Sequence, residues 1–180
     1  MQKEQNNYAF IDWANLHKGT EALGWSLDYG RFRVWLSEKY GVTKAYLFLG
    51  FLPWEQNFYV QLSEAGFTLV HKDLAYGDKG KIKANCDADL VLGAVVDYYE
   101  NCFDRAVLVS SDGDFASLVK FLEAKGAFCA LISPHKKCSY LLKKLNIPIV
   151  YLDTQKNILE LLPQKEKAPG GDETPQGPLS

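Results

Sequence analysis

Short apolar runs alternate with amphipathic stretches along most of the chain, a pattern typical of alternating strands and helices. The apolar runs predict strands at residues 8–11, 45–49, 67–71, 107–109, 127–132 and 149–152. Between them, apolar side chains recur at helical spacing over residues 28–40, 53–65, 87–99, 115–122 and 140–145. Because strands that alternate with helices pair in parallel, we predict an α/β fold: a three-layer α/β/α sandwich with a central, mainly parallel, Rossmann-like sheet.

Two stretches depart from this alternation. Residues 72–86 form a long polar connection that contains lysines and glycines, and we expect it to be a functional or mobile loop that borders the site. A short apolar helix is expected at residues 158–162. Residues 163–180, which are rich in Pro and Gly and lack aromatics, have the composition of a disordered tail. The expected organisation is one domain, residues 1–162, followed by this tail.

Composition and charge narrow the classes of protein. A chain of 180 residues with 47% hydrophobic content is long enough to bury one core. No apolar run approaches the roughly 20 residues of a membrane span, and residues 1–7 are polar, so we expect a cytoplasmic protein away from membranes. The cysteines form no close pair that would indicate zinc or a disulfide framework. A net charge of −2 leaves any binding of nucleic acid to a local patch.

The candidate chemistry begins at residues 106–115, which read A-V-L-V-S-S-D-G-D-F. An apolar strand ends there in two serines and two aspartates, immediately before a helix. In an open α/β sheet, ligands bind where strands end in this way. Asp114 taken alone fits a helix N-cap equally well. Asp112 and Asp114 together are more than one helix start needs, so we expect a partner elsewhere in the chain.

Asp12 supplies this partner, because it ends the first strand in the same manner. If the strands take the order 3-2-1-4-5, the first and fourth lie about 4.8 Å apart, and Asp12 and Asp112 meet at one edge. A third carboxylate is expected from residues 85–89, N-C-D-A-D, which open the helix before the fourth strand, although Asn85 or Asp87 also fits a capping role there. Asp89 points about 200° away from Asp87 around that helix, so only one of the two faces the site.

Carboxylates that lie this close repel one another unless a cation binds between them. Magnesium is usually held in proteins by one or two carboxylates together with substrate phosphate, and manganese behaves similarly. An Asp-rich site without His or Cys therefore predicts Mg²⁺ or Mn²⁺ as cofactor. Asp97 lies about 15 Å further along the helix than Asp87 and cannot bind the same ion.

Three motifs, taken together and in order, resemble the NYN domain family, a branch of the PIN-like nucleases. They are F-I-D-W-A-N at residues 10–15, K-I-K-A-N-C-D-A-D-L-V-L at 81–92 and V-L-V-S-S-D-G-D-F at 107–115, within a likeness that spans residues 8–153. The resemblance implies a PIN-like sandwich and a magnesium- or manganese-dependent ribonuclease, which hydrolyses RNA phosphodiester bonds without a protein nucleophile. The residues that match the family's acidic, metal-binding and catalytic cluster are Asp12, Asp87, Asp112 and Asp114.

The resemblance also suggests where substrate would bind. Asn15 and Ser110 match polar neighbours of the cluster, whereas Gly93 stands where many relatives carry another Asp, which leaves the number of metal ions open. The expected substrate is single-stranded RNA. The residues expected to contact it are Asn15, Lys79, Lys81, Lys83, Ser110 and Ser111, with His135, Lys136 and Lys137 after the fifth strand. Each lysine also fits a solvated loop, and Trp13, Trp54 and Tyr76 fit either base stacking or the core.

Two other functions compete with the nuclease. A haloacid-dehalogenase-like phosphatase also ends its strands in acidic turns, but it needs a second Asp at the position of Ala14. A non-catalytic module that keeps the fold and binds RNA or a protein partner fits the mild net charge and Gly93. A second copy of the chain is a further candidate partner.

Overall fold

The computed structural model describes residues 5–72, 75–76, 82–83 and 86–162. The strands of its main sheet are β1 (Asn7–Asp12), β2 (Val42–Gly50), β3 (Thr68–Lys72), β6 (Ala106–Val109), β7 (Phe128–Ser133) and β8 (Ile149–Tyr151). The helices are α1 (Trp13–Glu21), α2 (Tyr29–Tyr40), α3 (Gln56–Glu64), α4 (Asp87–Tyr99), α5 (Ala116–Ala124), α6 (Tyr140–Lys143) and α7 (Lys156–Leu159). Single 3-10 turns are η1 (Pro53–Glu55), η3 (Gly113–Phe115) and η4 (Leu152–Gln155).

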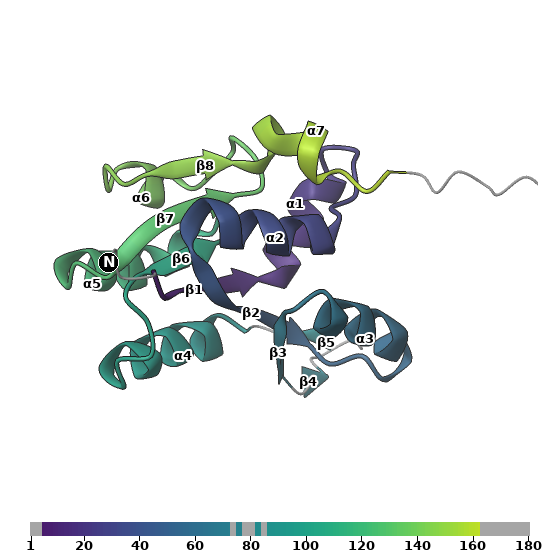
Figure 1. Cartoon of the computed structure of the whole chain (residues 1–180), viewed down its shortest axis with the longest axis horizontal. Helices are drawn as coiled ribbons and strands as arrows, with labels where there is room; N and C mark the ends of the chain where they lie inside the picture. Colours follow the sequence, from purple (N-terminus) through teal and green to yellow (C-terminus); the bar gives the residue numbers. More distant parts are fainter. Residues whose placement is uncertain (1–4, 73–74, 77–81, 84–85, 163–180) are drawn as a thin grey trace, which may run out of the picture.

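The sheet is parallel throughout, with the strand order β3-β2-β1-β6-β7-β8 (Figure 1). Counted along the chain, the strands that were predicted therefore lie across the sheet in the order third, second, first, fourth, fifth and sixth. The first and fourth predicted strands are therefore neighbours, as the sequence indicated. The carboxyl ends of β1 and β6 meet at the middle of one sheet edge, which is where a crevice forms in doubly wound folds.

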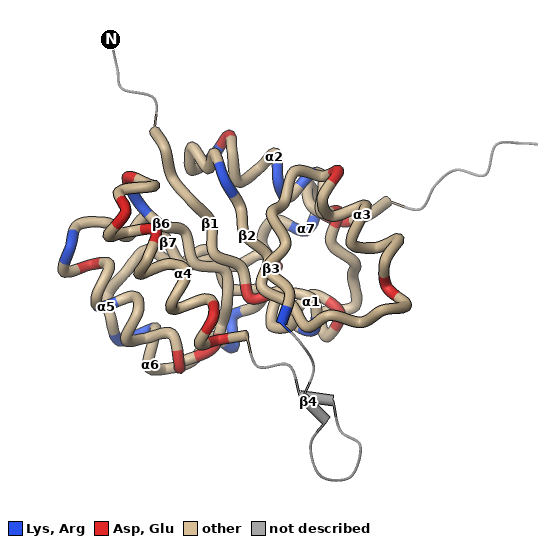
Figure 2. Tube along the Cα trace, turned by 90° about the horizontal axis from the view of Figure 1, so that it is seen from below, with Lys and Arg blue, Asp and Glu red and all other residues tan. Residues whose placement is uncertain are grey.

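Helices cover both faces of the sheet, and the strands alternate between two hydrophobic cores. Ala9 and Ile11 of β1 face a core shared with α1, α2 and α3, whereas Phe10 faces a second core shared with α4, α5 and α6. Figure 2 shows α4, α5 and α6 on one side of the strands and α2, α3 and α7 on the other. The predicted α/β/α sandwich is confirmed.

Local signals set the bounds of the best-predicted helices. Asp28 caps α2, because its carboxylate accepts the backbone N–H of Arg31 at 3.0 Å. Gly41 ends α2 with a φ of 62°, a left-handed conformation that glycine adopts without strain. The helix predicted at residues 87–99 coincides with α4, and the helical residues predicted after Phe115 fall in α5.

Three regions differ from the sequence-based predictions. No helix was predicted at residues 13–21, where α1 buries Leu16, Gly19 and Thr20, of which only Leu16 is a large apolar residue. The short helix predicted at residues 158–162 forms, but its bounds were wrong: α7 ends at Leu159, and Glu160 instead forms a β-bridge with Leu27. Within residues 72–86, the strands β4 (Ala75–Tyr76) and β5 (Ile82–Lys83) pair antiparallel.

Some predictions fall on residues that the structure does not describe. The expected mobility of most of the 72–86 connection and the expected disorder of residues 163–180 lie outside the described part of the chain. Among the described residues, no helix has the length and apolar character needed to cross a bilayer.

Asn7 is a fully buried polar residue at the amino end of the central strand. Its side-chain amide donates to the carbonyl of Tyr40 at 2.6 Å, and its side-chain oxygen accepts the backbone N–H of Arg105 at 3.1 Å. It therefore joins the end of α2 and the start of β6 to β1. Buried polar groups are tolerated when they are paired in this way.

We expect Asn7→Ala to lower the free energy of unfolding by about 2–3 kcal/mol, because the Tyr40 carbonyl and the Arg105 N–H lose their partner in the interior. Urea denaturation of the parent and the variant measures this loss. Asn57→Ala, on the exposed face of α3, is the control and should stay within about 0.5 kcal/mol of the parent. Equal stabilities for the two variants would contradict the role given to Asn7.

Candidate functional site

The carboxyl ends of β1 and β6 bring the first two site residues side by side. Ile11 pairs with Val109 in the parallel ladder, so the next residues, Asp12 and Ser110, follow in register. The Ser110 hydroxyl donates to the Asp12 carboxylate at 3.2 Å and accepts the backbone N–H of Asp112 at 3.1 Å. Ser110 is fully buried and thus joins the two acidic turns.

Asp12 is fixed from two directions. One carboxylate oxygen accepts the Ser110 hydroxyl, and the other accepts the backbone N–H of Asn15 at 3.1 Å, which makes Asp12 the N-cap of α1. The carboxylate of Asp12 is thereby held by both the strand edge and the start of a helix. The positive end of the α1 dipole also favours the charged form of this carboxylate.

Asn15 connects the two turns a second time. Its side-chain oxygen accepts both the backbone N–H of Ser111, at 2.8 Å, and the Ser111 hydroxyl, at 2.9 Å. Both residues were expected to contact substrate. In the structure they fasten α1 to the turn after β6, and this contact keeps the acidic turns together.

Three further carboxylates gather at the same edge. One oxygen from each of Asp87, Asp112 and Asp114 lies within 4.8 Å of the others. We call these residues together with Asp12 the carboxylate cluster. Burial raises the pKa of Asp12, and the charges of Asp87 and Asp112 raise that pKa further, while the hydrogen bonds from Asn15 and Ser110 lower it. Figure 2 shows acidic positions gathered along this edge, between α4 and α6.

In the turn from β6 into η3, the N-cap is not Asp114, as its position in the sequence suggested, but Asp112. Asp112 is the N-cap, since its carboxylate accepts the Asp114 backbone N–H at 3.0 Å, whereas Asp114 lies in the first helical turn and is exposed. Gly113 separates them because a Cβ there would lie 2.4 Å from the Ser139 hydroxyl. This glycine lets the loop before α6 approach the acidic turn.

Helix α4 contributes Asp87 and directs its other aspartates elsewhere. Its N-cap is Cys86, so the capping alternative for Asp87 is not what the structure shows. Asp89 pairs with Lys72 at 2.6 Å, and Asp97 lies with Glu100 and Cys102 in a separate group. The three-carboxylate group of Asp87, Asp112 and Asp114 forms without an acidic residue at position 93.

The other residues expected to contact substrate are either outside the described part of the chain or lie in other loops. Lys79 and Lys81 are not among the described residues, and of Lys83 only the backbone, in β5, is described. Lys136 and Lys137 are exposed after β7, and His135 is half-buried. Trp54 is 68% exposed in η1, so it is not a core residue, whereas Trp13 is partly buried against the core.

The donors of the carboxylate cluster fit a hard divalent cation. Every candidate ligand is an oxygen, and the three oxygens of Asp87, Asp112 and Asp114 lie close enough together to share one ion. Like charges at this spacing are costly without a counter-charge. Magnesium and manganese prefer such oxygen ligands, whereas zinc is usually bound through His or Cys.

Comparison with known proteins finds a matching family model and a similar solved structure. The family model described as "NYN domain" matches residues 8–147, most of the chain. No curated protein matches the chain. A solved structure of a protein of unknown function from Vibrio parahaemolyticus RIMD 2210633 is similar to it, with a TM-score of 0.73 and 23% identity, over 89% of this chain and 100% of that one. At this identity the likeness establishes the fold.

We expect Ser110→Ala to lower the free energy of unfolding by about 1–3 kcal/mol, because it removes a donor to Asp12 and the acceptor of the Asp112 N–H in a fully buried position. Ser117→Ala, on the exposed surface of α5, is the matched control and should change stability by less than about 0.5 kcal/mol. Chemical denaturation measures both variants. If Ser110→Ala unfolds like its control, the link between the two turns is not important for stability.

Proposed function

Because the chain belongs to the NYN domain family, within the PIN-like nuclease superfamily, we propose that it is a Mg²⁺- or Mn²⁺-dependent ribonuclease that hydrolyses phosphodiester bonds of single-stranded RNA. The observation that carries this proposal is the carboxylate cluster. Three of its oxygens, from the turn after β6 and the start of α4, lie within 4.8 Å of one another, and Asp12 at the end of β1 borders them.

The contacts of each residue suggest whether it would bind a cation or position its neighbours. Asp87, Asp112 and Asp114 would hold a cation through their neighbouring oxygens, and Asp12 borders them from β1. Such a cation, when bound, neutralises phosphate charge and makes a bound water more acidic. Ser110 and Asn15 act as positioning residues, since they hold Asp12 and the turn that carries Asp112 in place.

The exposed carboxylate of Asp114 lies nearest to solvent within this group. It is therefore best placed to accept a proton from an attacking water at the edge of the cluster. No serine, cysteine or histidine is needed as a nucleophile in this reaction, which agrees with the composition of the cluster.

The alternative is a non-catalytic NYN module that binds RNA or a protein. It predicts RNA binding without cleavage, whatever divalent cation is supplied. A cleavage assay on a mixed pool of single-stranded RNA, in EDTA and then with magnesium or manganese, separates the two functions. Cation-dependent cleavage supports the nuclease, and binding without cleavage supports the module.

The variant Asp112→Asn tests whether Asp112 binds a cation, because it keeps the shape of the side chain and its ability to accept the Asp114 N–H. We expect RNA cleavage to fall by at least about 100-fold, because a cation ligand is weakened. Without metal the variant should unfold at the same temperature as the parent or higher, because carboxylate repulsion is relieved. Cleavage rates with magnesium or manganese and thermal unfolding in EDTA measure both effects.

Asp104→Asn is the matched control for this experiment. Asp104 also accepts a backbone N–H in a turn, from Asn6 at 3.1 Å, but it lies before β6 and outside the carboxylate cluster. Cleavage by this variant should equal that of the parent. An Asp112→Asn protein that unfolds earlier yet cleaves normally would show that Asp112 is a structural aspartate.

A further inference from the structure

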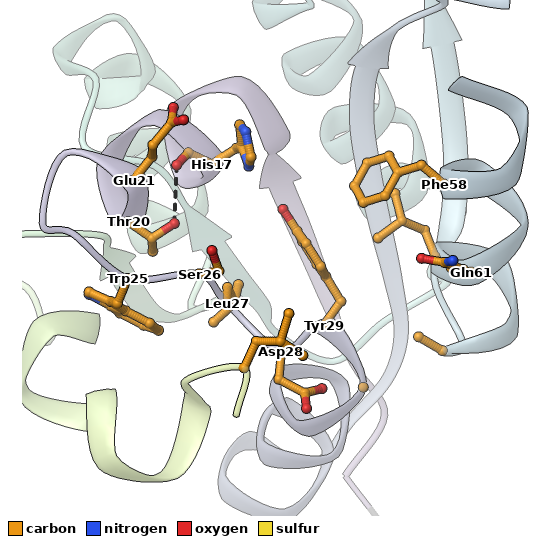
Figure 3. A pocket seen from close by; sticks show the side chains of 14 residues that line it. His17, Thr20, Glu21, Trp25, Ser26, Leu27, Asp28, Tyr29, Phe58 and Gln61 are labelled. Atoms are coloured by element: carbon orange, nitrogen blue, oxygen red, sulfur yellow. Dashed lines mark hydrogen bonds between the residues drawn. The ribbon is translucent and has the colours of Figure 1, made fainter. Parts of the chain in front are cut away.

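A cavity of about 360 Å³ opens on the face of the sheet that carries α1, α2 and α3. Its walls come from the second half of α1, from residues 25–30 and from one side of α3 (Figure 3). Cavities that hold small organic ligands have about this size, with mostly apolar walls and a few polar groups. None of the residues assigned to the carboxylate cluster lines it.

The cavity is nevertheless joined to the carboxylate cluster through Trp13, the residue directly after Asp12. The indole N–H of Trp13 donates to the Tyr29 hydroxyl at 3.0 Å. The Trp13 ring stacks on His17 with centroids 4.9 Å apart and meets Phe58 at 5.8 Å. Tyr29, His17 and Phe58 all line the cavity. Trp13 does not itself line the cavity, but it contacts three residues that do and directly follows Asp12 of the cluster.

The walls combine flat rings with groups that form hydrogen bonds. Phe58 and Tyr29 meet edge to face with centroids 5.8 Å apart, and Gln61 points into the cavity from the next turn of α3 (Figure 3). Burial raises the pKa of Tyr29 to about 12, so its hydroxyl keeps its proton at neutral pH. Aromatic faces and amide groups are what single-stranded nucleic acid binders use to hold an unstacked base.

The charges around the cavity select against phosphate. Glu21 and Asp28 line it, and the Asp28 carboxylate already accepts the backbone N–H of Arg31 and pairs with the Arg31 guanidinium at 3.4 Å. An anionic phosphate would be repelled by the Glu21 carboxylate, whereas a neutral base can donate its amino or imino hydrogens to it. The charge distribution thus favours a base in the cavity and leaves the phosphates of the same strand outside it.

We propose that this cavity, which we call the base pocket, receives one nucleobase of the RNA strand whose neighbouring phosphodiester lies at the carboxylate cluster. This inference rests on the proposed ribonuclease function. His17 follows Asp12 by five residues, about 7.5 Å along a helix, which is short enough for one strand to reach both places. The base pocket is then the part of the molecule that sets the position of the strand.

The first test uses free nucleosides, which lack phosphate. Adenosine, cytidine and uridine are titrated separately into the full chain in EDTA, with inorganic phosphate as a fourth probe, and amide and side-chain resonances are followed by NMR. We expect saturable shifts at Gln61, Phe58 and Trp25 with at least one nucleoside and none with phosphate. Absence of shifts at these residues with all nucleosides, or shifts there with phosphate alone, would overturn the proposal.

The matched variants are Gln61→Ala and Gln56→Ala, two exposed glutamines of α3 of which only Gln61 lines the pocket. Gln61→Ala should weaken nucleoside binding about threefold to tenfold, as expected for a lost hydrogen bond, and Gln56→Ala should leave it unchanged. Thermal unfolding checks that both variants fold like the parent. Equal binding by the two variants would contradict a base in contact with Gln61.

The second test separates the pocket from the reaction. Single-stranded RNAs of one sequence, each with one abasic residue at a different position, are cleaved by the parent and by Gln61→Ala. The base pocket is supported if the abasic residue slows cleavage only at one position next to the cleaved bond. This slowing should be smaller with Gln61→Ala than with the parent. If the unmodified RNA is cleaved normally and the abasic residue lowers the rate equally at every position, the base pocket is refuted and the ribonuclease function is retained. Nucleoside shifts without any cleavage refute the ribonuclease and leave a nucleoside site.

Discussion

Parallel pairing between β1 and β6 is the contact on which the candidate site depends. These strands are separated by nearly a hundred residues of sequence, and their register sets Ile11 opposite Val109. A slip by one residue would turn every side chain of β1 to the other core and carry Asp12 away from Ser110. The hydrophobic alternation of Ala9, Phe10 and Ile11 between the two cores therefore fixes the position of a polar group at the end of the strand.

Helix starts then offset part of the cost of holding like charges together. Asp12 caps α1, Asp112 caps the turn that leads into α5, and Asp87 is the first residue of α4. Each carboxylate therefore lies where backbone N–H groups and the positive end of a helix dipole favour negative charge. For Asp12 and Asp112, capping is therefore compatible with a place in the carboxylate cluster, whereas Asp87 and Asp114, for which capping was the alternative, are not the caps of their helices.

The sequence predicted the elements whose signals are local or strongly periodic. The parallel sheet followed from alternating strands and helices, its order is the one assumed for a doubly wound sheet, and α4 followed from its apolar spacing. Helix α1 was missed because Gly19 and Thr20 occupy buried positions where apolar residues would show the period. The helix expected near the end was displaced because Leu161 and Leu162, which suggested it, are each 56% exposed. Hydrophobic character alone does not reveal which leucines become buried.

Contacts between distant residues could not be predicted in this way. Nothing near Gly113 indicates that Ser139 packs against it, and nothing near Asp89 indicates that Lys72 pairs with it. Asp89 pairs with Lys72 while Asp87 lies in the carboxylate cluster, in agreement with the helical geometry, by which only one of the two aspartates faces the site. The base pocket is still less predictable, because its walls come from α1, residues 25–30 and α3, and a stretch near Leu161 completes them.

The start of α1 couples the two proposed binding places. Asp12 is bound to Ser110 on the side of β6, while the next residue, Trp13, contacts His17, Phe58 and Tyr29 on the side of α2 and α3. A helix that begins at Asp12 fixes the directions of both side chains at once, so a rotation of α1 would disturb carboxylates and cavity together. The short helix α1, which was not predicted from the sequence, is thus the element that relates the position of a bound strand to the carboxylates that would act on it.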